Sequence, residues 1–214
     1  LSNKLIENQG ALTISEATKN VPGVYTFATY GNKRESMSSR GFRGIPILKN
    51  GVRVHSDFRG VGILTDMQGV DNIQVLKGTA SITQGVATDL GSPGGVINIV
   101  TKTPKYTHGG SVSIRGGSFG SVRPTFDLYG PLNKEKNIAF RLNGSLERAD
   151  SYRDMVGKES FYFNPSFEWV INDKTTLTLE MDHYYDTRTP DLGTVNLDEN
   201  DINAIYDLPH SQFL

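Results

Sequence analysis

From Gly110 onward, apolar and polar side chains alternate with a period of two. Residues 122–129, 138–147, 161–169 and 176–182 each carry apolar side chains at every second position and polar ones between them. Because successive side chains of a strand point to opposite faces, each segment predicts a strand with one apolar and one polar face. Together with residues 111–115, this pattern predicts about five antiparallel strands, each roughly ten residues long.

The connections between these strands alternate in length. Residues 131–137 and 172–174 are short polar turns, whereas residues 149–158 and the tail after Thr187 are longer. Short turns at one rim and long loops at the other are typical of outer-membrane β-barrels. A soluble β-sandwich also alternates, because its apolar faces pack on each other. Strand length and the density of charge on the polar face favour the barrel.

Five strands do not close a cylinder, and an open strand edge in lipid leaves backbone groups unsatisfied. We therefore expect the chain to be a fragment, with the remaining strands supplied by sequence outside it. The chain ends at Asp207 to Leu214 without a terminal strand, and it opens at Leu1 without a visible signal peptide.

Composition excludes several classes of function. The net charge of the 214 residues is -1, whereas nucleic-acid binders usually carry a basic excess. The absence of cysteine excludes disulfides, thiolate metal sites and cysteine nucleophiles. No apolar run is long enough for a transmembrane helix. The four histidines, His55, His108, His183 and His210, are not spaced as metal ligands, so we expect no protein-bound metal. No catalytic arrangement of serine, histidine and an acid is visible either, so we expect that the protein is not an enzyme.

The first half of the chain has a mixed pattern. Thr13 and Glu16 have the spacing of a capping box, which predicts a short helix that ends before Val21-Pro22-Gly23. One further helical turn is expected over residues 64–68. Short apolar runs predict strands, and Asn50-Gly51 predicts a hairpin turn between two of them. These runs are 45–48, 52–54, 73–76 and 96–100. The pattern indicates a small α+β domain.

Two glycine-rich segments of this half do not fit nucleotide sites. Residues 78–85 lack the lysine and hydroxyl residue that end a phosphate-binding loop. Residues 91–95 precede a predicted strand, whereas the glycines of a dinucleotide site open a helix. We interpret both segments as turns that need positive φ or close backbone packing.

Several sequence blocks of the first half resemble the plug domain of TonB-dependent receptors of Gram-negative outer membranes. These blocks occur in the order that the family has, and they are residues 21–24, 39–44, 49–53, 75–78 and 94–102. The resemblance implies an α+β plug domain over residues 1–106. It also implies that residues 107–214 are the first part of a transmembrane β-barrel of about 22 strands, with about five strands and an extracellular loop.

Two positions depart from the family pattern, since Gln74 stands where glutamate is usual and Thr79 where proline is usual. The resemblance implies a receptor in the cell outer membrane, surrounded by its lipid, that imports a scarce solute. The plug gates the barrel, and the TonB energy-transducing complex pulls on a short box that is expected before Leu1. No nucleic acid is implied as a partner.

The siderophore branch of the family fits best, in a hydroxamate, ferrichrome-like form. The residues that resemble it are Arg40-Gly41-Phe42, Asn98 with Thr101-Lys102, and the segment 187–193. Iron would arrive as a ferric siderophore, so no resident cofactor is expected. Two alternatives stay open: import of cobalamin or an oligosaccharide by the same family, and a soluble all-β binding or adhesion module.

The resemblance also suggests site residues. Arg40 and Lys77 match plug positions whose positive charges face carboxylates of the barrel in relatives, so they are candidates for a plug–barrel latch. The alternative for Arg40 is that it bridges strands of the plug itself. The candidates for contact with the siderophore are Tyr30, His55, Phe58 and Arg59. Aromatic rings are suited to contact an amphipathic chelate, and Arg59 is suited to bind an anionic one. The alternative is that these four residues are ordinary loop side chains without a role in binding.

Overall fold

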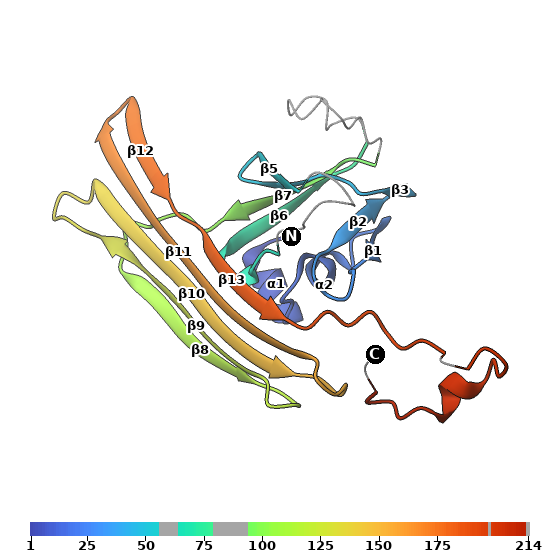
Figure 1. Cartoon of the computed structure of the whole chain (residues 1–214). Helices are drawn as coiled ribbons and strands as arrows, with labels where there is room; N and C mark the ends of the chain where they lie inside the picture. The colour runs from blue at the N-terminus through green and yellow to red at the C-terminus, as the bar shows by residue number, and fades with distance from the viewer. Residues whose placement is uncertain (56–63, 79–93, 197, 213–214) are drawn as a thin grey trace.

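The computed structural model describes residues 1–55, 64–78, 94–196 and 198–212. A compact group of helices and small sheets, from α1 to β7, lies against the concave side of a long curved sheet, from β8 to β13 (Figure 1). We call the first part the plug and the second the wall. Among the described residues, no helix is both long and apolar enough to cross a membrane.

Two short helices open the plug. Helix α1 (Asn3–Gln9) begins after Ser2, whose hydroxyl accepts from the backbone N–H of Leu5 at 3.4 Å, and it ends at Gly10 with φ of 65°. The sequence pattern did not indicate this helix. Helix α2 (Ile14–Thr18) was predicted, and its N-cap is Thr13 as expected.

The capping of α2 differs from the predicted box in one bond. Thr13 Oγ1 accepts from the N–H of Glu16 at 3.2 Å, as a capping box requires. The Glu16 carboxylate, however, accepts from Leu12 N at 2.7 Å rather than from Thr13. A second carboxylate, that of Glu35, occupies the N-terminus of α2 instead.

The plug contains two sheets. One is antiparallel, in the order β1 (Val24–Ala28), β2 (Ser36–Ser39) and β3 (Phe42–Arg43). The other has the order β5 (Val52–His55), β4 (Ile47–Lys49), β7 (Val96–Thr101) and β6 (Val70–Leu76), and its β4 and β7 are parallel. The 3₁₀ turn η1 (Met67–Gly69) precedes β6, close to the predicted helical turn.

The hairpin between β4 and β5 turns at Asn50 and Gly51, with φ of 50° and 80°, as predicted. Apolar side chains from both helices and both sheets form one core, which includes Ile6, Ile14, Met37, Ile45, Ile73, Ile97 and Ile99. The short helices are therefore held by tertiary packing rather than by their own propensity.

Gly95, at the entry to β7, is expected to tolerate no side chain. Its φ is 107°, and a Cβ there would lie 1.9 Å from the carbonyl oxygen of Leu76. Gly95→Ala should therefore destabilise the plug by about 1–3 kcal/mol from strain alone, with the backbone clash adding to it. Denaturant unfolding of the plug measures this loss. Gly116→Ala is the matched control, because a Cβ at Gly116 meets nothing within 4 Å; equal losses in the two variants would refute the argument.

The wall is antiparallel throughout, in the order β12–β11–β10–β9–β8, with β13 also paired to β11. Its strands are β8 (Gly109–Gly116), β9 (Val122–Pro131), β10 (Ile138–Asp150), β11 (Gly157–Asn172), β12 (Thr175–Glu180) and β13 (His183–Arg188). Because β12 pairs with the second half of β11 and β13 with the first, these two elements are one interrupted strand. The predicted count of about five strands is confirmed.

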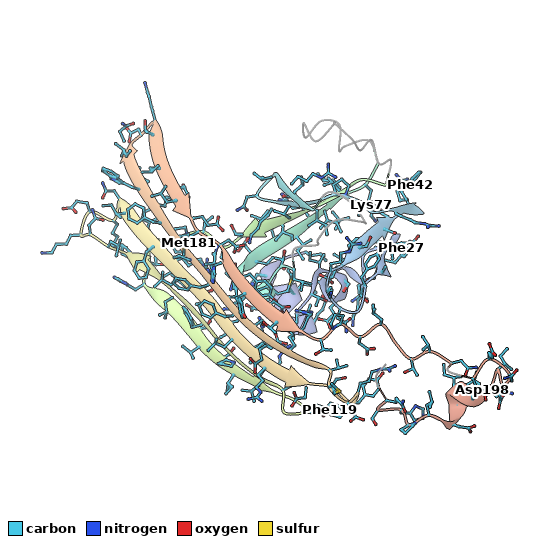
Figure 2. All side chains as sticks on the ribbon, in the orientation of Figure 1. Phe27, Phe42, Lys77, Phe119, Met181 and Asp198 are labelled. Carbon is cyan, nitrogen blue, oxygen red and sulfur yellow. The ribbon has the colours of Figure 1, made fainter. Side chains whose placement is uncertain are left out.

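The interruption lies at Met181, which Figure 2 labels. The N–H of Met181 donates to the carbonyl of Pro165 on β11 at 3.0 Å. Proline has no N–H to donate to a neighbouring strand. The side-chain amide of Asn164 donates to the carbonyl of Met181 at 2.9 Å and so replaces part of the lost pairing. The strand therefore keeps its place in the wall.

The two faces of the wall differ in the way that a barrel requires. Apolar side chains of the convex face are exposed, for example Val112 (78 %) and Ile114 (76 %) on β8. Polar side chains of the concave face are buried against the plug: Arg123, Asp127, Arg141, Asn143, Ser145, Asn164 and Ser166. A β-sandwich buries its apolar faces, so this arrangement contradicts the sandwich alternative and confirms a plug joined to an open part of a barrel sheet.

Candidate functional site: the polar contact between plug and wall

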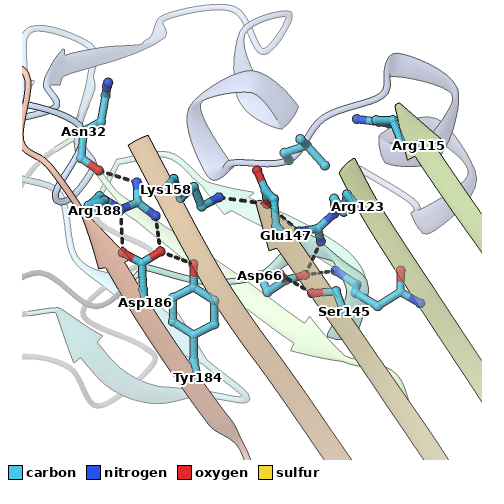
Figure 3. A network of polar contacts seen from close by, with 12 residues as sticks. Asn32, Asp66, Arg115, Arg123, Ser145, Glu147, Lys158, Tyr184, Asp186 and Arg188 are labelled. Carbon is cyan, nitrogen blue, oxygen red and sulfur yellow. Dashed lines mark hydrogen bonds and ion pairs between the residues drawn. The ribbon is translucent and has the colours of Figure 1, made fainter. Parts of the chain in front are cut away.

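The concave face of the wall contacts the plug through ion pairs and hydrogen bonds, part of which Figure 3 shows. The contacts form four groups, of which the first and the fourth are neighbours, because Glu147 of β10 pairs with Ser160 of β11, which in turn pairs with Asp186 of β13. Alternation places these side chains: on β9 and β10, every second residue points toward the plug, and the strand register aligns them in rows.

The first group is centred on Asp66, which precedes η1. Its carboxylate accepts from Arg123 of β9 at 2.7 Å and from the hydroxyl of Ser145 of β10 at 2.7 Å. The side chains of Asp66 and Arg123 are only 3 % and 6 % exposed. Arg123 also pairs with Glu147 of β10 at 2.7 Å, and Lys158 of β11 pairs with the same carboxylate at 2.8 Å. A plug carboxylate is thus held by a wall cation in a nearly dry environment.

In the second group the cation belongs to the plug and the carboxylate to the wall. Lys102, which follows β7, pairs with Asp127 of β9 at 3.0 Å. Arg141 of β10 binds the same carboxylate with two nitrogens, at 2.9 Å and 2.7 Å, and donates to the carbonyl of Thr103 at 3.0 Å. Burying three charges is stable only because each is paired and hydrogen-bonded. Asp127 therefore joins the end of the plug to the wall.

The third group surrounds the β4–β5 turn. Glu180 of β12 accepts from Asn50 Nδ2 at 3.1 Å and from Thr101 Oγ1 at 2.9 Å. Lys49 forms an ion pair with Asp182, which lies in the interruption between β12 and β13. The predicted turn thus carries a wall contact of its own.

The fourth group lies at the rim with the long connections. Arg188, near the end of β13, donates to the backbone carbonyl of Asn32 at 2.6 Å, and Asp191 N donates to the carbonyl of Gly31 at 3.2 Å. A cavity of about 440 Å³ lies here between plug and wall. Its charged lining residues are Glu16, Arg34, Glu35, Asp150, Lys158, Arg188 and Asp191.

The segment that connects β7 to β8, residues 102–108, is also held against the wall. The hydroxyl of Tyr106 donates to Glu168 of β11 at 2.7 Å. Desolvation, followed by the bond and charge of Glu168, raises the pKa of Tyr106 to about 12, so the phenol stays protonated and keeps donating at physiological pH. The expected domain boundary at 106/107 lies in this link, between the end of β7 at Thr101 and the start of β8 at Gly109. It stays a prediction.

The predicted latch residues lie elsewhere. Lys77 is exposed, on the side of the plug away from the wall (Figure 2), and its ammonium donates to the carbonyl of Pro22. Arg40 is exposed too, with φ of 54°, and its N–H donates to the carbonyl of Gly23 at 2.8 Å. Among the described residues, no wall carboxylate pairs with either cation. Their proposed pairing with the barrel stays a prediction.

The predicted ligand residues are only partly described. Tyr30 lies in the loop between β1 and β2, where the guanidinium of Arg34 stacks 4.0 Å from its ring centre. His55 is the last residue of β5 and pairs with Ile47. Phe58 and Arg59 lie outside the described residues. The role of these four residues in binding stays a prediction.

Sequence reasoning missed the residues that join plug and wall, above all Asp66. The wall partners carried a signal, because Arg123, Asp127 and Arg141 stand on the polar faces of predicted strands. Alternation gives the face of each residue, but it does not say which plug residue will lie opposite. The described part of the chain contains no group of three or more His, Asp or Glu placed to hold a metal ion. The absence of a resident metal stays a prediction.

The comparisons with known proteins agree with this architecture. The family model of the TonB-dependent receptor plug domain matches residues 1–96. The ferrioxamine B receptor of Salmonella typhimurium is 28 % identical over 199 residues, which are 91 % of this chain and 27 % of that protein. The chain thus spans about a quarter of the length of this curated relative.

Two solved structures resemble the chain over most of its length. The pyoverdine outer-membrane receptor FpvA of Pseudomonas aeruginosa matches with a TM-score of 0.75 and 27 % identity, over 86 % of this chain and 26 % of the receptor. The ferric-catecholate import receptor Fiu of Escherichia coli K12 matches with a TM-score of 0.76 and 28 % identity, over 89 % of this chain and 27 % of the receptor. Both matches extend beyond the plug into the wall.

Proposed function

Because the chain is part of a TonB-dependent receptor, with the plug domain in residues 1–96 and adjoining barrel strands, we propose that the complete protein imports ferric siderophores across the outer membrane of a Gram-negative cell. The plug closes the barrel, and its movement opens a path. The protein carries its iron chelate without transforming it, so it acts as a receptor and transporter rather than as an enzyme.

The observation that carries this proposal is the chemistry of the contact between plug and wall. The four groups join the two parts through charged and hydrogen-bonding side chains, while the apolar core of the plug is formed within the plug itself. Polar contacts exchange readily for contacts with water, whereas separating an apolar interface exposes hydrophobic surface. The plug is thus seated firmly at rest and is able to move as a unit.

Energy for that movement must come from outside this contact. Separating even one of the buried pairs costs several kcal/mol if the charges are left unpaired. We propose that the TonB complex supplies this work through a segment before Leu1. That segment would lead directly into α1, whose first turn is capped by Ser2.

The substrate class is proposed from two lines of support. The relatives named above are receptors of ferrioxamine B, pyoverdine and ferric catecholate. The cavity at the long-loop rim is lined by both carboxylates and cations, which suits a large polar chelate. Within this class, we keep the hydroxamate type as the first candidate for the ligand.

Calorimetric titration of the complete receptor in detergent tests this proposal. The ligands are ferrioxamine B, pyoverdine and a catecholate siderophore, each with and without iron, together with cobalamin and an oligosaccharide. We expect tight binding of one iron-loaded siderophore and much weaker binding of its iron-free form. Binding of cobalamin or of the oligosaccharide alone would contradict the proposed siderophore class. Binding of the catecholate siderophore alone would keep that class but contradict the hydroxamate type.

A further inference from the structure

Glu35 connects two parts of the plug that are distant in sequence. It is the last residue of the β1–β2 loop, directly before β2, and is buried. Its carboxylate accepts from the N–H of Ile14 at 3.0 Å, from the N–H of Ser15 at 2.8 Å and from the hydroxyl of Ser15. These donors form the first turn of α2, where backbone N–H groups have no partner within the helix. One side chain from the β1–β2 loop thus holds the start of α2.

The loop that carries Glu35 has an unusual backbone. Tyr30, Gly31 and Asn32 follow one another with φ of 51°, 70° and 63°, all in the left-handed region. Non-glycine residues rarely adopt this region, and each costs free energy that the surroundings must offset. The bond from Arg34 N to the carbonyl of Thr29, at 3.2 Å, closes the loop at its base. The loop is therefore a compact unit held by its contacts.

Contacts with the wall hold the tip of the same loop. Arg188 donates to the carbonyl of Asn32, and Asp191 N donates to the carbonyl of Gly31. In Figure 3, Arg188 lies between Asn32 on one side and Asp186 on the other. Arg188 and Asp191 both line the rim cavity, as do Asn32 and Glu35. The loop therefore touches the rim at its tip and α2 at its base.

We propose that Glu35 is a positioning residue that couples the outer rim of the wall to helix α2. A solute that enters the rim cavity would displace Arg188 or Asp191. Such a displacement shifts the tip of the loop. Because the loop is compact, the shift reaches Glu35 and changes how firmly its carboxylate holds the first turn of α2. The role in reporting an occupied receptor rests on the proposed function, but the coupling itself does not depend on a ligand.

The coupling differs from an ordinary helix cap in what it transmits. A cap alone stabilises α2 whatever happens at the rim. A coupling residue makes α2 respond to substitutions at the rim, and that response disappears with the residue itself. A double-mutant cycle between rim and cap separates the two roles.

The test is hydrogen exchange on the complete receptor in detergent, without ligand. The reporter is the backbone N–H of Ala17, which donates to the carbonyl of Thr13 at 3.1 Å rather than to Glu35. Four proteins are compared: the wild type, Arg188→Gln, Glu35→Gln, and the double variant. We expect Arg188→Gln to accelerate exchange at Ala17 roughly three- to ten-fold in the wild-type background, and to have no effect when Glu35→Gln is present.

Two matched controls isolate the contact between Arg188 and the loop. Asp186→Asn weakens the ion pair between Asp186 and Arg188 but leaves the guanidinium able to donate to Asn32. Arg148→Gln removes an arginine of β10 whose ion pair with Glu159 is exposed at the same rim. Both variants should leave exchange at Ala17 unchanged. Equal acceleration by Arg188→Gln with and without Glu35, or none in either background, would overturn the coupling.

A second arm separates this inference from the proposed function. Iron-loaded ferrioxamine B is added to the wild type and to Glu35→Gln, and binding is measured in the same samples. If it binds both proteins, it should change exchange at Ala17 more in the wild type than in Glu35→Gln, because Ser15 and Glu16 of α2 line the same cavity and meet the ligand in both. An equal change in both would refute the coupling while leaving import of siderophores intact. An intact double-mutant cycle with no binding of any ferric siderophore would refute the proposed function alone.

Discussion

Replacing Arg123 by methionine should loosen the plug more than any other single change in the Asp66 group. The substitution leaves the carboxylate of Asp66, only 3 % exposed, without its cation, and only Ser145 Oγ and the N–H of Gln68 still donate to it. Breaking a buried pair by removing one partner costs about 3–5 kcal/mol. Glu147 is affected less, because Lys158 still pairs with it at 2.8 Å.

Hydrogen exchange at the amide of Ile73, which donates to the carbonyl of Leu1 at 2.9 Å, measures the loss in the complete receptor. Exchange should be roughly 100- to 4000-fold faster, because each 1.4 kcal/mol is a factor of ten. The control is the double variant Asp66→Leu with Arg123→Met, which removes both charges and should recover much of the loss. If the double variant were as loose as the single one, the ion pair would not be the cause.

Replacing Asp127 by leucine should have an effect of similar size at the other end of the plug. The substitution leaves two buried cations, Lys102 and Arg141, without a carboxylate. We again expect a loss of about 3–5 kcal/mol. It is read from exchange at the amide of Lys102, which donates to the carbonyl of Gly69 at 2.9 Å.

The contrasting variant is Lys102→Met, which leaves the two-nitrogen pairing of Arg141 with Asp127 intact within the wall. It removes one charged hydrogen bond and should cost about 1.5–3 kcal/mol, less than Asp127→Leu. A larger loss for Lys102→Met than for Asp127→Leu would mean that Lys102 mainly holds the plug. The pairing of Arg141 with Asp127 within the wall would then contribute little to holding it.

Alternation predicted the wall well, because its cause is local. Successive side chains of a strand point to opposite faces, so the faces of β9, β10 and β11 follow from sequence alone. The break between β12 and β13 did not follow from the pattern. It arises from Pro165 on the neighbouring strand, and the sequence does not show which residue lies opposite a proline.

The plug was predicted less completely. Asn50-Gly51 carries a strong turn signal and was placed correctly, as was the N-cap at Thr13. Helix α1 was missed because it has only seven residues and one buried side chain, Ile6, so no periodic apolar stripe is visible. Strands β1 to β3 were missed as well, since the β2 segment Ser36–Ser39 is buried although mostly serine.

The candidate site depended on contacts between residues far apart in sequence. Asp66 and Ser145 are 79 positions apart, and Asn32 and Arg188 are 156 apart. No local pattern indicates such partners. The family resemblance directed attention to Arg40 and Lys77, whereas the described contacts are carried by Asp66, Lys102 and their wall partners.

Uptake of radioactive iron by living cells is a direct test of whether the complete protein imports ferric siderophores. The complete protein is produced in Gram-negative cells that lack their own siderophore receptors, and ferrioxamine B, pyoverdine and a ferric catecholate are supplied in turn. We expect uptake from one of these carriers, and no uptake once the proton gradient of the inner membrane is collapsed. Uptake of none of them, in cells whose outer membrane contains the folded receptor, would contradict it.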